Sequence, residues 1–72
     1  MDVSEQALLK RINRVLAKRG ERVRTPRSQR GRIELGVYYV SDVDRNYIVA
    51  TDIDLEVWGR DLGCLTTREV VV

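Results

Sequence analysis

The clearest pattern of apolar positions lies near the N-terminus of the chain. Its members have the spacing of one face of an amphipathic helix, and they are Leu8, Leu9, Ile12, Val15 and Leu16. Asp2 or Ser4 can cap the start of this helix, because a short side-chain oxygen can accept a hydrogen bond from a free first-turn N–H group. Gly20 can adopt the left-handed conformation that often follows the last helical turn. The pattern therefore predicts a helix over residues 4–19.

A second pattern, typical of β-strands, follows between residues 33 and 50. Apolar side chains recur at every second position from Ile33 to Tyr39, and Tyr47–Ala50 forms another β-prone run. Residues 44–46 separate the two runs and end in Asn46, and asparagine tolerates the left-handed conformation that a hairpin turn needs. We therefore expect a β-hairpin that is centred on residues 35–51.

Alternation along these two strands assigns their side chains to two faces. Counting by twos gives one face with Val37, Tyr39 and Val49 and another with Tyr38, Val40 and Ile48. A β-bulge at the turn would shift this register. Both faces carry large apolar groups, and two strands alone are only marginally stable in water. A third strand or a partner chain is therefore expected.

The residues after the hairpin carry the signs of a second, shorter helix. Thr51 and Asp54 resemble a capping box, with Asp in place of the usual Glu. The residues that should face the hairpin have helical spacing, and they are Leu55, Trp58 and Leu62. Gly59 lies inside this helix, where it costs about 1 kcal/mol relative to Ala and permits the close approach of another backbone.

These elements predict an α+β domain with an N-terminal amphipathic helix, a β-hairpin and a short second helix, in the order α-β-β-α. The β-prone tail, residues 69–72, could add a C-terminal strand to this hairpin or to that of a neighbouring copy. With 72 residues, there is room for a single small domain, residues 1–72, and about 60% of the unfolded surface becomes buried in a chain of this size. Such a core is marginal, which makes self-association a candidate source of stability.

The numbers of cysteine and histidine residues limit the kinds of disulfide, metal site and catalytic site that the chain can form. One Cys and no His leave no intramolecular disulfide and too few ligands for a Cys/His zinc site. Without His, no nucleophile–base pair can be drawn around Cys64, so a non-catalytic protein without a cofactor is expected. Residues 42–46 copy the first half of an EF-hand loop, but Tyr47 replaces its glycine and Ile53 its glutamate, so no metal site is predicted.

Three further features concern the location of the protein. A lone thiol suits a reducing compartment such as the cytoplasm. The N-terminus lacks a basic segment followed by an apolar run, so it does not resemble a signal peptide. No apolar stretch approaches the roughly 18 residues that a membrane-spanning helix needs. We therefore expect a cytoplasmic protein without a membrane partner.

Charge is distributed unevenly along the chain. Ten of the thirteen basic residues but only four of the eleven acidic ones lie in residues 1–36. Lys10, Arg14 and Lys18 line one side of the predicted first helix. Such asymmetry hints at a polyanionic partner, but it is equally compatible with attraction between copies of the chain or with a solvated basic face.

Residues 20–32 have no apolar period and are expected to form a flexible, arginine-rich loop or arm. The arginines of this segment are Arg22, Arg24, Arg27, Arg30 and Arg32. An arginine side chain pairs with phosphate through two parallel hydrogen bonds, so an extended arm could follow a nucleic-acid backbone. No aromatic residue is interleaved with these arginines, so the stacking component of single-strand recognition is missing from the arm.

The order of three segments resembles small bacterial proteins of about this length, a family of unknown function. The segments are LLKRINRVLAKRGERVR, LGVYYVSDVDRNYIV and DLEVWGRDLGCL, and they fall within residues 8–65. The resemblance implies a bacterial cytoplasmic protein and assigns no activity, ligand or site.

Two hypotheses for the function follow. The first is a nucleic-acid-binding module, in which the arm and the helix stripe contact the DNA or RNA backbone through Lys10, Arg14, Lys18, Arg22, Arg24, Arg27, Arg30 and Arg32. The second is a protein-interaction or self-assembling module, such as a homodimer. Arm arginines paired with the acids of the second helix would favour the second hypothesis, whereas an open basic surface would favour the first.

Overall fold

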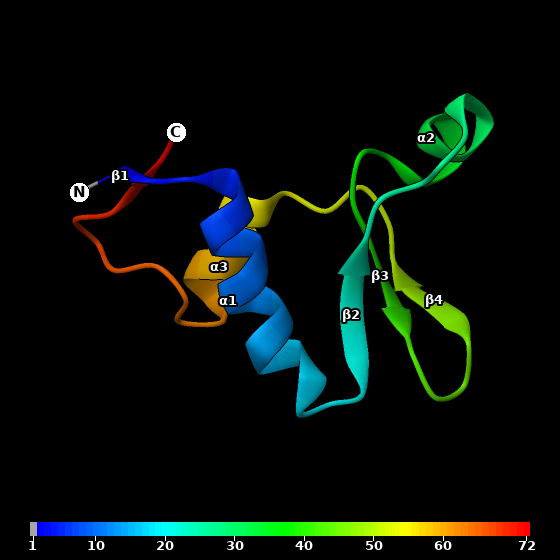
Figure 1. The fold of residues 1–72 in the computed structure, drawn as a ribbon, viewed down its shortest axis with the longest axis horizontal. Helices are drawn as coiled ribbons and strands as arrows, with labels where there is room; N and C mark the ends of the chain where they lie inside the picture. Colours follow the sequence, from blue (N-terminus) through cyan, green and yellow to red (C-terminus); the bar gives the residue numbers. More distant parts are fainter. Residues whose placement is uncertain (1) are drawn as a thin grey trace.

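The computed structural model describes residues 2–72 and has the α+β architecture that the sequence predicts (Figure 1). In chain order, its elements are β1 (Asp2–Val3), α1 (Glu5–Ala17), β2 (Glu21–Arg24), α2 (Gln29–Leu35), β3 (Tyr39–Asp42), β4 (Tyr47–Ala50), α3 (Leu55–Asp61) and β5 (Val70–Val71). Within the described chain, no helix has the length and apolar character that a membrane span requires.

The first helix, α1, follows the prediction closely. The Ser4 hydroxyl accepts a hydrogen bond from the Ala7 N–H group at 3.1 Å, as a helix cap requires. Leu8, Ile12 and Leu16 are fully buried on its inner face. Gly20 follows with a φ of +72°, which is the left-handed conformation expected after the last turn.

The segment predicted as an arm contains regular structure, which corrects the expectation for residues 20–32. Residues 21–24 form β2, which pairs with β3 and completes an antiparallel sheet of order β2-β3-β4. Val23 is only 4% exposed and lies opposite Val40. A third strand or a partner chain is expected from the sequence, but a strand with one buried apolar residue among charged ones leaves no alternating pattern. The third strand could therefore not be located in this segment from its sequence.

The start of the predicted hairpin strand is also wrong. Ile33 and Leu35 lie in α2, where the Ser28 hydroxyl accepts a hydrogen bond from the Gly31 N–H group at 3.0 Å. Gly36 then has a φ of +78°, which interrupts any extended run across it. The strand β3 therefore begins only at Tyr39.

The hairpin of β3 and β4 has the predicted turn but a shifted register. Asn46 has a φ of +57°, as the turn requires. Ser41 lies opposite Ile48 and Val40 opposite Ala50, so Val49 is the extra residue of a β-bulge. Because of this bulge, Val40 and Ile48 point to opposite faces of the sheet, and their predicted common face is wrong.

The second predicted helix exists as α3, with a different cap and a different neighbour. Asp54, not Thr51, caps it, since its carboxylate accepts hydrogen bonds from the N–H groups of Glu56 and Val57 at 3.0 and 3.3 Å. The helix packs against α1 rather than against the hairpin. Gly59 makes this contact close, because a Cβ atom there would lie 2.7 Å from Leu8 Cδ1.

The tail of the chain also forms a strand, but its partner differs from the predicted one. Val71 lies opposite Val3 in a parallel pair of β5 and β1, so the tail joins the N-terminus of its own chain instead of the hairpin. The pair of β1 and β5 lies on the side of the helices that is remote from the sheet (Figure 1).

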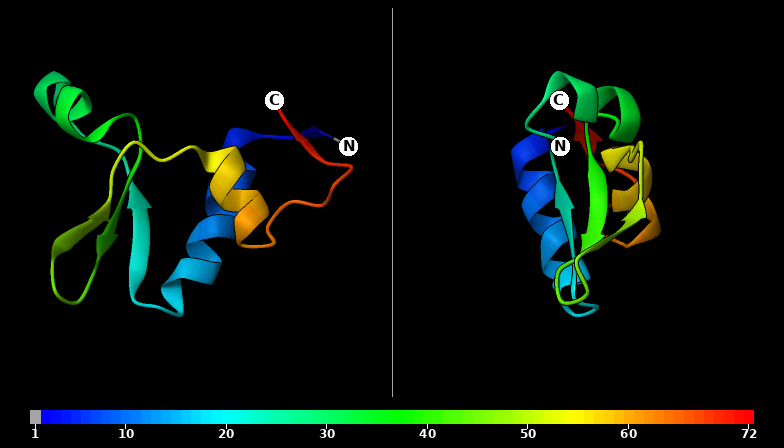
Figure 2. Two further views of the ribbon diagram at one scale, coloured as in Figure 1. Left: turned by 180° about the vertical axis from the view of Figure 1, so that it is seen from behind. Right: turned by 90° about the vertical axis from the view of Figure 1, so that its right-hand side faces the viewer.

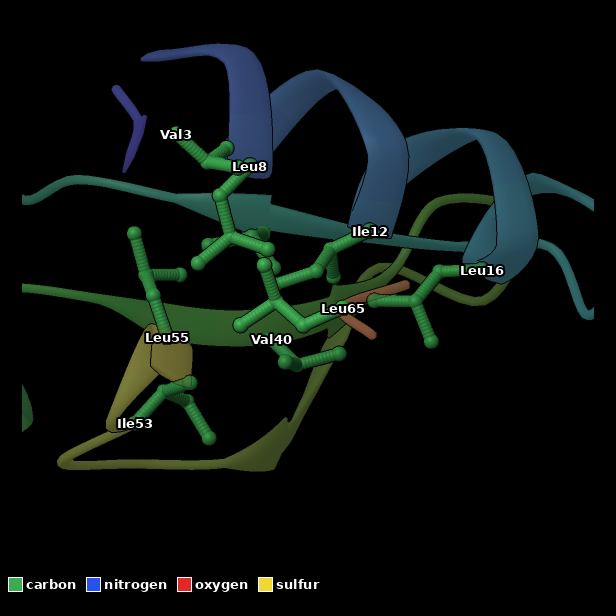
Figure 3. Close-up of a cluster of buried hydrophobic side chains, with 9 residues drawn as sticks. Val3, Leu8, Ile12, Leu16, Val40, Ile53, Leu55 and Leu65 are labelled. Carbon is green, nitrogen blue, oxygen red and sulfur yellow. The ribbon is translucent and has the colours of Figure 1, made fainter. Parts of the chain in front are cut away.

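The core fills the space between α1, α3 and one face of the sheet (Figure 3). Its buried residues are Val3, Leu8, Ile12, Leu16, Val23, Val40, Ile53, Leu55 and Leu65. α1 and α3 both lie behind the strands in the right-hand view of Figure 2, and α2 stands at one end of the sheet. The sheet face towards the viewer carries no helix across its strands, and we call it the open face.

Candidate nucleic-acid interface

A groove runs between α1 and the outer edge of β2, and three arginines of the predicted arm line it. Its volume is about 440 Å³, and its walls include Leu9, Asn13, Arg22, Arg24, Thr25 and Arg27. The fold thus gathers Arg22, Arg24 and Arg27 at one place, although the sequence pattern predicted only a flexible arm for them. We call this site the arginine groove.

A hydrogen bond between the two walls fixes the geometry of the arginine groove. The Asn13 side-chain oxygen accepts a hydrogen bond from the Val23 N–H group at 2.8 Å. This N–H group points out of the sheet edge, so Asn13 replaces the strand that would otherwise pair there. The helix α1 is thereby tied to β2, and the groove lies along their junction.

Tyr38 borders the same groove and connects it to the start of α1. Its hydroxyl donates a hydrogen bond to the Glu5 carboxylate. This hydrogen bond, burial of the ring and the negative charge of Glu5 all raise the pKa of Tyr38. The tyrosine therefore stays neutral at physiological pH and acts as a donor to α1.

Strand alternation places two of the groove arginines on the open face. Arg22 lies opposite Ser41, and Arg24 lies opposite Tyr39, whereas Val23 between them points into the core. A guanidinium group at either arginine can thus reach the groove at the sheet edge and the rim of the open face. The two surfaces are continuous at β2.

The groove arginines form no salt bridge with any residue in the described part of the chain. The recorded pairs join Arg11 to Glu69, Arg30 to Glu34 and Arg60 to Glu56, at 3.0, 3.5 and 3.1 Å. The only one of these that involves the predicted arm lies within α2. The acids of α3 therefore pair with none of the arm arginines among residues 2–72, and the guanidinium groups of the arginine groove remain available to an external anion.

The other predicted binding residues are less closely grouped. On a helix that turns about 100° per residue, Lys10 lies about 60° from Asn13, Arg14 about 100° and Lys18 about 140°. None of these three residues lines the arginine groove; Lys10 is the nearest of them around the helix, and the stripe then turns away from the groove. Arg30 and Arg32 lie on α2, which Figure 1 places at the far end of the strands from α1.

Sequence reasoning missed two residues of this surface. Asn13 is polar among apolar neighbours on α1, which is a signal of a specific hydrogen bond, but its partner lies on the unpredicted strand β2. Tyr39 is grouped by the sequence pattern with Val37 and Val49 on one face of the predicted hairpin, and it lies half-buried on the open face beside Arg24. Neither position could be recognised without the pairing of β2 with β3.

Within residues 2–72, no three His, Cys, Asp or Glu side chains are grouped so that they could hold a metal ion. Burial raises the pKa of the Cys64 thiol, and the nearby positive charge of Arg11 offsets this effect only in part. The thiol form therefore predominates at neutral pH, and a thiolate nucleophile is not favoured.

Comparison of the chain with protein-family models, curated proteins and solved structures gives no match. The arginine groove and the open face are therefore interpreted from their own chemistry.

Proposed function

We propose that the chain is a non-catalytic module that binds the sugar–phosphate backbone of nucleic acid along the arginine groove. The observation that carries this proposal is the convergence of Arg22, Arg24 and Arg27 on one groove without a carboxylate partner among the described residues. Guanidinium groups bind phosphate oxygens through paired hydrogen bonds, and arginine keeps its charge at any physiological pH.

The spacing of the arginines supports a linear polyanion as the ligand. Arg22 and Arg24 are two residues apart on a strand, which separates their backbone positions by about 6.6 Å. Successive phosphates on one strand of B-form DNA advance by about 3.4 Å along the axis, so the two arginines span about two phosphate steps. Lys10 extends the positive surface along α1. Contacts of this kind position a nucleic acid and carry little base specificity.

The salt dependence of binding tests this proposal. Fluorescence anisotropy with labelled single-stranded RNA and duplex DNA is measured from low to near-physiological salt. Three phosphate contacts predict a slope of log K against log salt of about −2 for a single strand and about −3 for a duplex. Arg24→Ala or Arg27→Ala should make this slope shallower by the contribution of one phosphate contact, which is about 0.7 for a single strand and about 0.9 for a duplex.

Arg45→Ala is the matched control for these variants. It removes the same charge from the exposed β3–β4 turn, and Arg45 is not among the residues that line the arginine groove. Its slope should equal that of the unmodified protein. Failure of micromolar protein to bind either polymer at low salt would contradict the proposal, and so would an equal effect of Arg45→Ala and Arg24→Ala.

A second candidate, self-association of two copies, has its own supporting observation. Tyr47, Ile48 and Val49 of the edge strand β4 are 49%, 47% and 40% exposed. Natural proteins usually protect such an edge with charges or proline, and β4 has neither. Pairing of β4 with the β4 strand of a second copy would cover these side chains. Light scattering over a concentration series would detect the dimer.

The location of the protein is inferred from its thiol. Cys64 is half-buried and unpaired, which supports a reducing compartment such as the cytoplasm.

A further inference from the structure

We propose that the open face binds the bases of a single-stranded nucleic acid, with Tyr39 as the stacking residue. This inference rests on the proposed function and goes further, because it selects single strands over duplexes and assigns a residue to the bases. The backbone of the strand lies along the arginine groove, and its bases extend from there over β3.

The composition of the open face follows from strand pairing. One row across the sheet contains Arg22, Ser41 and Ile48, and the next contains Arg24 and Tyr39. Side chains that lie directly opposite each other on antiparallel strands share a face. These two rows therefore offer cations at the β2 edge, an aromatic ring on the central strand and an apolar side chain on β4.

Alternation also removes the acidic residues from this face. Glu21 lies opposite Asp42, and Asp42 lies opposite Tyr47, so this third row points to the side that bears the helices. The two rows of the open face contain two arginines and no carboxylate. A polyanion is therefore attracted to the open face and finds no like charge in these rows.

The dimensions of the sheet suit a backbone at the edge and a base over the centre. Neighbouring strands lie about 4.8 Å apart, so the Tyr39 ring stands one strand inward from Arg24. A phosphate held by Arg24 can thus place its base against this ring. Stacking on an aromatic side chain requires an unpaired base, because the bases of a duplex are already stacked on each other.

The hydroxyl group of Ser41 provides an independent observation that supports a ligand on the open face. Its hydroxyl is buried and has no hydrogen-bond partner among the described residues. An unsatisfied buried hydroxyl is unfavourable by itself. Ser41 lies between Arg22 and Ile48 in its row. A base that displaces the long Arg22 side chain would supply the missing hydrogen-bond partner.

The arrangement disfavours a peptide that adds a strand to the sheet beside the arginine groove. Strand addition at β2 needs the outward N–H group of Val23, and Asn13 already accepts its hydrogen bond. A ligand at this edge must therefore bind through side chains, as phosphates bind to guanidinium groups. This requirement favours the single strand over an extended peptide.

The test compares three labelled ligands of equal length: a single-stranded oligonucleotide, the same backbone without bases, and the duplex. The unmodified protein should bind the single strand about 5- to 150-fold more tightly than the abasic strand, which is the range that loss of one stacked base produces. The salt slopes of the single strand and of the abasic strand should be equal, because the phosphates are unchanged. This comparison requires no variant to fold.

Substitutions then assign the effect to one residue. Tyr39→Leu should weaken binding of the single strand by a similar factor and leave its salt slope unchanged, and Tyr39→Phe should retain the affinity. Tyr47→Leu is the matched control, because strand alternation places this exposed tyrosine in the row that points away from the open face. It should bind as tightly as the unmodified protein.

The outcomes separate the two proposals. Equal affinities for the single strand, the abasic strand and the duplex, each with a steep salt slope, would overturn the stacking inference and leave phosphate binding intact. Equal affinities of Tyr39→Leu and Tyr47→Leu for the single strand would also overturn the stacking inference and leave phosphate binding intact. Absence of binding to any of the three ligands at low salt would overturn the proposed function together with this inference.

Discussion

The side chain of Asn13 contributes both to the stability of the fold and to the shape of the arginine groove. Its oxygen accepts the hydrogen bond of the outward Val23 N–H group, which is partly buried. A donor that loses its partner costs more than the hydrogen bond itself contributes, because water cannot reach it freely. Structure and binding are therefore coupled at this residue.

Changing Asn13 separates the two roles. Asn13→Ala should lower the free energy of unfolding by about 1–3 kcal/mol, since the Val23 donor is left without a partner. Asn13→Asp keeps an acceptor oxygen and should remain closer to the unmodified protein in stability. It also adds a negative charge to the arginine groove and should weaken nucleic-acid binding. Urea denaturation and anisotropy measure the two effects. Equal stability of the Ala and Asp variants would contradict this role.

Glu69 is a second residue with a measurable effect, here on the pH dependence of stability. Hydrogen bonds from the Thr66 N–H group and from Arg11 hold its pKa below the ordinary value of 4.5. The unfolded chain therefore takes up this proton at a higher pH than the folded chain does. The stabilisation is present above pH 4.5 and is lost as the pH falls through the folded-state pKa.

Glu69→Gln should therefore reduce the loss of stability in acid. Thermal unfolding from pH 7 to pH 3 should show a smaller fall in Tm for this variant than for the unmodified protein. Glu34→Gln, which removes an exposed carboxylate from α2, is the control. Its fall in Tm from pH 7 to pH 3 should equal that of the unmodified protein. A Glu69→Gln profile parallel to that of the unmodified protein would count against the shifted carboxylate.

Among the secondary-structure elements, the contact between α1 and α3 depends on a glycine. Gly59 lies in the interior of α3, where alanine is normally favoured by about 1 kcal/mol. Here a Cβ atom would stand 2.7 Å from Leu8 Cδ1 and 3.3 Å from Leu65 Cδ1. Both of these leucines are buried in the core, so neither can move aside without loss of packing.

Gly59→Ala should therefore destabilise the protein despite the higher helix propensity of alanine. Overpacking of a core typically costs about 1–3 kcal/mol, which exceeds the propensity gain at its upper end. Val57→Ala changes an exposed position of the same helix and should alter stability by about 0.5 kcal/mol or less. Chemical denaturation gives both values. A Gly59→Ala variant that is more stable than the unmodified protein would show that the helices can separate without cost.

The elements that sequence predicted well are those whose signals are local. The helix α1 has its cap and its apolar face within one segment. The β3–β4 turn depends on adjacent residues, Asn46 with its positive φ and Asp42, which accepts a hydrogen bond from the Arg45 N–H group. The strand β2 depends instead on Val40 and Asn13, which lie far away in sequence. Its own residues are three charged side chains and one valine, and they satisfy no strand pattern by themselves.

In the candidate site, too, features that depend on single residues could be predicted, and features that depend on distant residues could not. The arginines could be identified from the sequence because their chemistry is a property of each residue. Their separation into a groove group and an α2 group could not, because it depends on the incorporation of β2 into the sheet and on the position of α2 outside it. The position of Tyr39 on the open face beside Arg24 likewise follows only from the pairing of β2 with β3.

In the whole molecule, the two candidate functions involve opposite edges of the sheet: nucleic-acid binding involves the β2 edge, and self-association involves the β4 edge. Asn13 closes the β2 edge and the arginine groove lies there, whereas the β4 edge exposes apolar side chains. A second copy that pairs at β4 would leave both arginine grooves accessible. It would also join two open faces into one surface about 24 Å wide across six strands.

This geometry predicts that self-association and nucleic-acid binding can be changed independently. Val49→Gln removes an exposed apolar contact of β4 without changing the charge, and it should weaken a dimer about tenfold or more. The salt slope of a short oligonucleotide that fits one groove should not change, because Val49 lies at the opposite edge. Sedimentation measures the first quantity and anisotropy the second. If Val49→Gln reduces the salt slope as Arg24→Ala does, then the arginine groove must be completed by the second copy.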